Sequence, residues 1–83
     1  MNHLLHNGEE VIYFGATVVL LRNGEIEQTI VIVGQDEINP EKNHISWTSP
    51  LAKNLIGKTI GQEFMFRSPH GEDWIEIINV LYL

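Results

Sequence analysis

The chain has 83 residues, 43% of them hydrophobic and 19% charged, which is enough for one small globular domain and too apolar for a disordered segment. Eleven acidic residues against five basic ones give a formal net charge of −6, which argues against a direct grip on nucleic-acid phosphates. The absence of cysteine excludes disulfide bonds and thiolate zinc sites, and no apolar run reaches the ~20 residues of a membrane-spanning helix. We therefore expect a cytoplasmic protein with no membrane partner.

The first ten residues differ from the rest of the chain in being mostly polar. They contain the turn signal Asn7-Gly8 and lack the basic and long apolar regions of a signal peptide. We interpret residues 1–10 as a lead-in or linker stub, and residues 11–83 as the domain itself.

The domain opens with two predicted strands. Residues 11–21 are rich in β-branched and aromatic side chains, and Gly15 within them indicates a bulge or a close backbone approach. Asn23-Gly24 predicts a tight hairpin turn. Residues 29–33 are apolar on both faces, which is typical of a strand inside a sheet.

A polar loop over residues 35–43 leads to a third predicted strand, residues 44–48. Alternation places Ile45 and Trp47 on one face, as core, and puts Ser46 and Thr48 on the other. A short helix follows, for which Ser49 is the expected N-cap, Pro50 the first residue and Gly57 the left-handed stop.

Two further strands complete the domain. Residues 61–67 and 74–83 flank the turn Pro69-His70-Gly71, and Ile75 and Ile77 are expected to point inward. Trp74 then lies on the opposite face, either as a binding anchor or as an edge residue half covered by a neighbour. The order β-β-β-α-β-β with short connections predicts an α+β domain, in which one short helix packs on a face of an antiparallel sheet.

No pattern of chemical residues indicates catalysis. The four histidines are scattered over the N-terminus and loop edges, whereas a metal site needs three or four convergent ligands. Acids that are adjacent in sequence, such as Asp36 and Glu37, are a weak signal of a shared site, because neighbouring residues on a strand face opposite ways. Asp36 follows a strand end, where its side chain is better explained by hydrogen bonds to backbone N–H groups in a turn. We expect no catalytic, metal-binding or cofactor-binding residue, and a domain that binds another protein.

Five stretches in this order resemble the C-terminal domain of the GreA/GreB transcription elongation factors. They are Phe-Gly-Ala-Thr-Val at 14–18, Ile-Val-Gly-Gln-Asp-Glu at 32–37, Ile-Ser-Trp-Thr-Ser-Pro-Leu-Ala at 45–52, Leu-Ile-Gly-Lys at 55–58 and Pro-His-Gly-Glu at 69–72. The resemblance covers residues 11–83 and implies an FKBP-like fold. It also implies docking on bacterial RNA polymerase, at the β′ subunit rim of the secondary channel.

The resemblance further implies which residues bind the polymerase. The family uses the segment between the third strand and the helix, here Ser46, Thr48, Ser49 and Pro50. GreB-like members often have Asp where Thr48 stands, and GreA-like members Asn. The family cleaves transcripts through a separate N-terminal coiled-coil arm whose acidic tip helps to hold Mg²⁺. These 83 residues contain no such segment, so we expect no transcript cleavage by this chain.

Two alternative functions stay open at this point. A peptidyl-prolyl isomerase is one, because the expected fold is FKBP-like, but it needs an aromatic-lined pocket for proline and fold alone does not establish function. A short-armed regulator, similar to the nucleoside diphosphate kinase regulators related to this family, is the other.

Overall fold

The computed structural model describes residues 11–82, so the lead-in predicted for residues 1–10 lies outside the described residues. The elements follow in the order β1 (Thr17–Arg22), β2 (Ile26–Val33), the 3-10 helices η2 (Gln35–Glu37) and η3 (Pro40–Lys42), β3 (His44–Ser46), α1 (Pro50–Leu55), β4 (Glu63–Ser68) and β5 (Gly71–Leu81). The predicted order of five strands and one helix is confirmed, and the fold is mostly β-sheet with a small helix.

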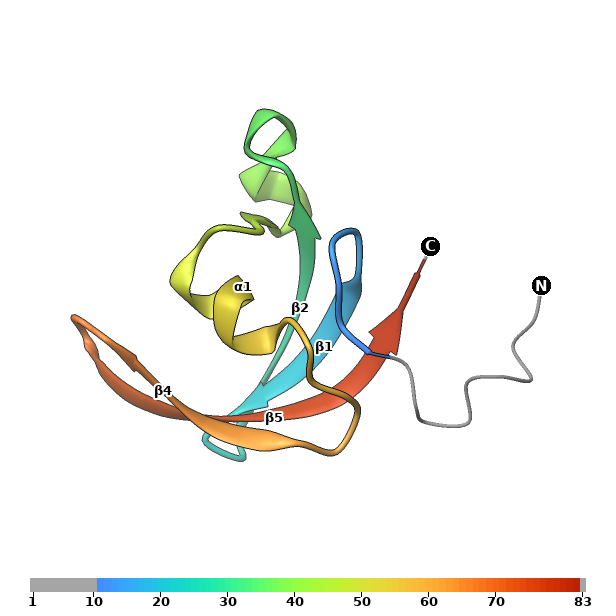
Figure 1. Ribbon diagram of the computed structural model, residues 1–83. Coiled ribbons are helices and arrows are strands. Elements are labelled where there is room, and N and C mark those ends of the chain that lie inside the picture. Colours follow the sequence, from blue (N-terminus) through green and yellow to red (C-terminus); the bar gives the residue numbers. More distant parts are fainter. Residues whose placement is uncertain (1–10, 83) are drawn as a thin grey trace, which may run out of the picture.

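The five strands form one sheet in the order β3-β2-β1-β5-β4. The sheet curls into a half-barrel, and α1 lies within the curve (Figure 1). β2 has a neighbour on each side, as predicted from its two apolar faces, and the edges of the sheet are β3 and β4. The concave face of the sheet therefore meets the helix, while no helix or strand formed by residues 11–82 packs over the convex face.

The pairing of β3 corrects the expectation of a fully antiparallel sheet. β3 runs parallel to β2, with Val31 opposite His44 and Val33 opposite Ser46, whereas the other strand pairs are antiparallel. The connection between these strands contains η2 and η3 and is too long for a tight hairpin. This connection returns the chain along β2. Asn43, whose backbone has a positive φ of 60, precedes β3, which then runs in the same direction as β2.

The first strand begins later than its composition predicts. Before Thr17 the chain makes a turn in which the N–H of Ala16 donates to the carbonyl of Tyr13 at 3.1 Å. Gly15 has φ +90, a conformation that side-chain-bearing residues rarely adopt. Its N–H donates to the carbonyl of Ile32 at 2.8 Å, which confirms the close backbone approach predicted at this glycine.

The core is a single cluster between α1 and the concave face of the sheet. Ile75 and Ile77 of β5 are fully buried, as predicted, and α1 contributes Ala52 and Leu55. The remaining buried side chains of the core come from β1, β2, the chain before β1 and the end of β5: Ile12, Ala16, Val18, Leu20, Ile30, Ile32 and Val80. A core this small gives the domain only marginal stability, because a domain of this size buries a modest share of its surface.

The ends of α1 match their predicted signals. The hydroxyl of Ser49 accepts a hydrogen bond from the N–H of Ala52 at 3.2 Å, Pro50 is the first helical residue, and Gly57 has φ +94 just beyond the last turn. Each feature satisfies or removes a backbone group that the helix leaves unpaired. A helix of six residues depends on such caps, since it has few internal hydrogen bonds of its own.

Replacing Ser49 with Ala is expected to lower the free energy of unfolding by about 1 kcal/mol, the usual cost of losing an N-cap acceptor. Urea denaturation of the two proteins measures the difference. Ser49→Asp is the matched control, because a carboxylate oxygen also accepts from the helix N–H groups and should retain most of the stability. Equal urea midpoints for Ser49→Ala and the parent chain would rule out the cap as a stabilising contact.

Candidate functional site

The parallel pairing of β2 and β3 brings two loops together at one edge of the sheet. Val33 and Ser46 are register partners at the ends of the two strands, and the chain continues in the same direction from both. Gln35 and Thr48, each two residues further on, therefore come side by side. The amide Nε2 of Gln35 donates to the Thr48 hydroxyl at 3.0 Å.

Two hydroxyls extend this contact into a connected group. The Oγ of Ser46 lies 2.7 Å from Oγ1 of Thr48 and accepts from the backbone N–H of Thr48 at 3.1 Å. We call Gln35, Ser46 and Thr48 the hydroxyl cluster. Ser46 and Thr48 are half-buried, so they are not the outward, unpartnered strand residues that alternation alone describes. Gln35 was missed because nothing in the sequence indicates a parallel register.

The segment after β3 is a tight turn from Ser46 to Ser49. The N–H of Ser49 donates to the carbonyl of Ser46 at 3.0 Å, which closes the turn directly at the start of α1. The four residues predicted to bind a partner thus lie on one short stretch. Within it Ser46 and Thr48 belong to the hydroxyl cluster, the hydroxyl of Ser49 serves as the helix cap, and Pro50 is exposed.

Trp47 is not part of the core, and the prediction that it packs there beside Ile45 is wrong. Its side chain is 48% exposed. β3 ends at Ser46, so Trp47 is the first central residue of the turn, where strand alternation no longer applies. Its backbone N–H donates to the carbonyl of Val33 at 2.9 Å, which holds the main chain against the sheet while the ring stays outside.

Trp74 differs from Trp47 in that its indole N–H forms a hydrogen bond within the domain. This residue of β5 is 43% exposed, and its indole Nε1 donates to Oε1 of Glu63 on β4 at 2.6 Å. Met65, its cross-strand partner, is also exposed on this convex face. The indole is therefore held to the neighbouring strand, as an edge residue would be, while the residue remains partly open to solvent.

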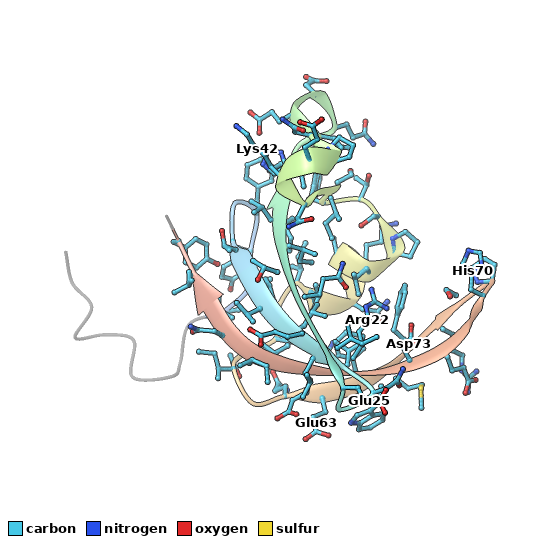
Figure 2. The ribbon with its side chains drawn as sticks, turned by 180° about the vertical axis from the view of Figure 1, so that it is seen from behind. Arg22, Glu25, Lys42, Glu63, His70 and Asp73 are labelled. Carbon is cyan, nitrogen blue, oxygen red and sulfur yellow. The ribbon has the colours of Figure 1, made fainter. Side chains whose placement is uncertain are left out.

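The acidic side chains near the hydroxyl cluster are exposed and do not point toward a common site. Asp36 and Glu37 lie on η2, and Asp36 makes no side-chain hydrogen bond to any residue between 11 and 82, which corrects its predicted role in the turn. Figure 2 shows Lys42 at this end of the molecule and His70 at the tip of the β4–β5 hairpin, well away from it. Among the described residues no three His, Asp or Glu side chains approach one another closely enough to share a metal ion.

Two further observations bear on the functions considered from the sequence. No pocket was found in the part of the chain that the structure describes, so an aromatic-lined recess for a prolyl ring is not seen there. Over the same residues, no helix is both long enough and apolar enough to cross a lipid bilayer.

Sequence comparison identifies relatives along nearly the whole chain. The family described as "Transcription elongation factor, GreA/GreB, C-term" matches residues 7–82. The chain is 47% identical over 79 residues to GreB of Neisseria meningitidis serogroup B, covering 95% of this chain and 48% of that protein. It is 42% identical over 84 aligned positions to GreA of Psychromonas ingrahamii, covering 100% of this chain and 52% of that protein. The chain therefore spans about half the length of these curated relatives.

Structural comparison gives the same assignment. The crystal structure of GreA factor homolog 1 (Gfh1) of Thermus thermophilus superposes with a TM-score of 0.74 at 28% identity, over 93% of this chain and 53% of that one. A GreA/GreB elongation factor from Nitrosomonas europaea has a TM-score of 0.74 at 23% identity, over 87% of this chain and 61% of that one, and supports the fold. By sequence and by fold, this chain belongs to the GreA/GreB family of transcription elongation factors and corresponds to their C-terminal domain.

Proposed function

We propose that this domain binds bacterial RNA polymerase at the β′ subunit rim of the secondary channel, through Ser46, Thr48, Ser49 and Pro50. Family membership supports the choice of partner, and the half-barrel with one α-helix among residues 11–82 supports extending the proposal to an FKBP-like fold. Such a partner places the action of the domain in the cytoplasm. Binding, rather than a catalytic step, is the role proposed for these residues.

The observation that carries the proposal is that hydrogen bonds already hold the Ser46–Ser49 turn in one conformation in the unbound domain. The hydroxyl cluster, the turn hydrogen bond and the helix cap fix this stretch from three sides. A loop that is already held in one conformation loses less conformational entropy on binding than a free one. The turn also stands at the sheet edge next to exposed Pro50, so a partner can reach it.

The charge of the domain supports a protein partner over nucleic acid. Asp36 and Glu37 are exposed beside the hydroxyl cluster, and the chain as a whole carries a formal charge of −6. Carboxylates here repel phosphates and attract Lys and Arg of a protein surface. A polymerase rim with basic side chains opposite η2 fits this distribution.

Replacing Thr48 with Lys is expected to weaken binding to purified RNA polymerase by about 10-fold or more, because a long cation replaces a hydroxyl at the centre of the turn. Biolayer interferometry on immobilised polymerase measures the dissociation constant, and thermal melting checks the fold. Thr29→Lys is the matched control, since Thr29 is exposed on β2 outside the turn, and it should bind as the parent chain does.

The milder variant Thr48→Val removes the same hydroxyl while it keeps the shape of the side chain. It is expected to weaken binding less than Thr48→Lys and to stay folded. If Thr48→Lys remains folded and binds polymerase as tightly as the parent chain and Thr29→Lys, the proposed docking segment is wrong.

A further inference from the structure

The two tryptophans of the chain differ in how their indole groups are satisfied. The two residues are exposed to a similar degree, 48% for Trp47 and 43% for Trp74. The indole N–H of Trp74 is used within the domain, in the 2.6 Å hydrogen bond to Glu63. The indole N–H of Trp47 donates to no residue between 11 and 82. Trp47 therefore offers both an apolar ring and an unused donor at the surface.

The exposure of Trp47 within the proposed docking segment has an energetic cost to the free domain. Burial of apolar surface is favourable by roughly 25 cal/mol per Å², and an exposed ring does not gain this free energy. Tryptophan is also among the residues most enriched at the energetic centres of protein interfaces. Trp47 lies within the Ser46–Ser49 turn itself, whereas Trp74 lies on β5 at the convex face.

The hydroxyl cluster adds a second, polar feature next to the ring. Thr48 Oγ1 accepts from Gln35, and Ser46 Oγ accepts from the Thr48 backbone N–H. The short contact between the two hydroxyls uses the hydrogen of one of them only. Whichever hydroxyl donates in that contact, the other keeps one O–H hydrogen that no group among residues 11–82 accepts. The cluster thus presents one hydrogen-bond donor to its surroundings.

We propose that Trp47 is the anchor of the docking surface, with its ring seated in an apolar recess of the partner and the spare hydroxyl donating to an acceptor at the mouth of that recess. This inference rests on the proposed function, because it names the chemistry by which the polymerase rim is recognised. The acceptor is a backbone carbonyl or a side-chain oxygen, since a cation or an amide N–H cannot accept from a hydroxyl.

The backbone around Trp47 is suited to such an anchor. Its own N–H is fixed to Val33, the turn is closed between Ser46 and Ser49, and Gln35 braces Thr48 from the next loop. The ring is therefore carried on an ordered segment and has few internal rotations to lose on insertion. Gln35 acts here as a positioning residue, because it reaches the partner surface through Thr48.

The test compares Trp47→Ala with Trp74→Ala, which removes an equally exposed ring from elsewhere on the same domain. Binding to immobilised RNA polymerase is measured by biolayer interferometry, with thermal melting of each variant. We expect Trp47→Ala to raise the dissociation constant by about 10-fold or more, as loss of an interface anchor does, and Trp74→Ala to change it by less than about 3-fold. Trp47→Phe, which retains an aromatic ring, is expected to fall between the parent chain and Trp47→Ala.

A second measurement does not depend on affinity or on the stability of an alanine variant. A benzophenone amino acid placed at position 47 should cross-link to polymerase on irradiation, and the same group at position 74 should not. Equal effects of the two alanine variants, or cross-linking from position 74 alone, would overturn the anchor. If Thr48→Lys abolishes binding while Trp47→Ala does not, the anchor fails and the proposed function stands. Failure of the parent chain to bind polymerase at all refutes the proposed function itself.

Discussion

Replacing Leu55 with Ala is expected to lower the free energy of unfolding by about 2–5 kcal/mol, the range for removing a fully buried leucine from a core. Leu55 is completely buried, and α1 is the only helix over the concave face in the described part of the chain. Loss of its side chain opens a cavity between helix and sheet that six helical residues cannot close by shifting. A domain of this length has a total stability of roughly 4–12 kcal/mol, so the variant lies near the limit of folding.

Urea denaturation followed by tryptophan fluorescence and by circular dichroism measures this change. Leu51→Ala is the matched control, since Leu51 lies on the same helix, is half-buried and should lose clearly less stability. If both variants lose the same small amount, α1 is not held by its buried face and the core is carried by the sheet alone.

Replacing Asp73 with Ala is expected to cost about 1–2 kcal/mol, because its carboxylate joins two strands and a turn. Oδ2 accepts from Nη1 of Arg22 at 2.8 Å, and Oδ1 accepts from the side-chain amide of Asn23 at 3.0 Å. Figure 2 shows Arg22 and Asp73 lying against each other at the base of the half-barrel. Both side chains are partly exposed, at 22% and 34%, and solvent screening keeps the expected value below that of a buried pair.

The chain offers an internal comparison for this ion pair. Glu72, the neighbouring acid, pairs with Arg67 at 3.0 Å, but these side chains are 53% and 79% exposed. Glu72→Ala should therefore change the free energy of unfolding by less than about 0.5 kcal/mol. Chemical denaturation at low and at high salt gives both values. A loss for Glu72→Ala as large as that for Asp73→Ala would show that the hydrogen bonds to Arg22 and Asn23 add nothing.

The parts of the fold that were predicted from sequence are those that depend on local backbone chemistry. Asn23 and Gly24 adopt positive φ values of 54 and 70, as a tight hairpin requires, and Ser49 and Gly57 mark the two ends of α1. Each of these signals depends on one or two residues and marks where an element begins or ends. Their positions along the chain therefore predict the order of the elements. Trp47 marks their limit, because the predicted alternation of residues 44–48 continued two residues beyond Ser46, where β3 ends.

The parts that were not predicted depend on contacts between distant segments. The direction of β3 is decided by how η2 and η3 turn the chain, and no residue between 34 and 43 indicates by itself a parallel rather than an antiparallel return. The hydrogen bond between Gln35 and Thr48 follows from that direction and was missed with it. The sequence analysis placed Ser46, Thr48, Ser49 and Pro50 where the third strand joins the helix but did not predict the turn there, and their role in binding polymerase stays a prediction.

The place of β5 within the sheet has a consequence for how the domain assembles. β1–β2 and β4–β5 are hairpins between strands close in the chain, and each can form quickly from its own turn. The two hairpins meet through β1 and β5, which pair Thr17 with Leu81 from opposite ends of the described chain. That union closes the largest loop in the fold and carries its main entropic barrier. We therefore expect the slow step of folding to be the docking of two preformed hairpins, with the β1–β5 seam formed last.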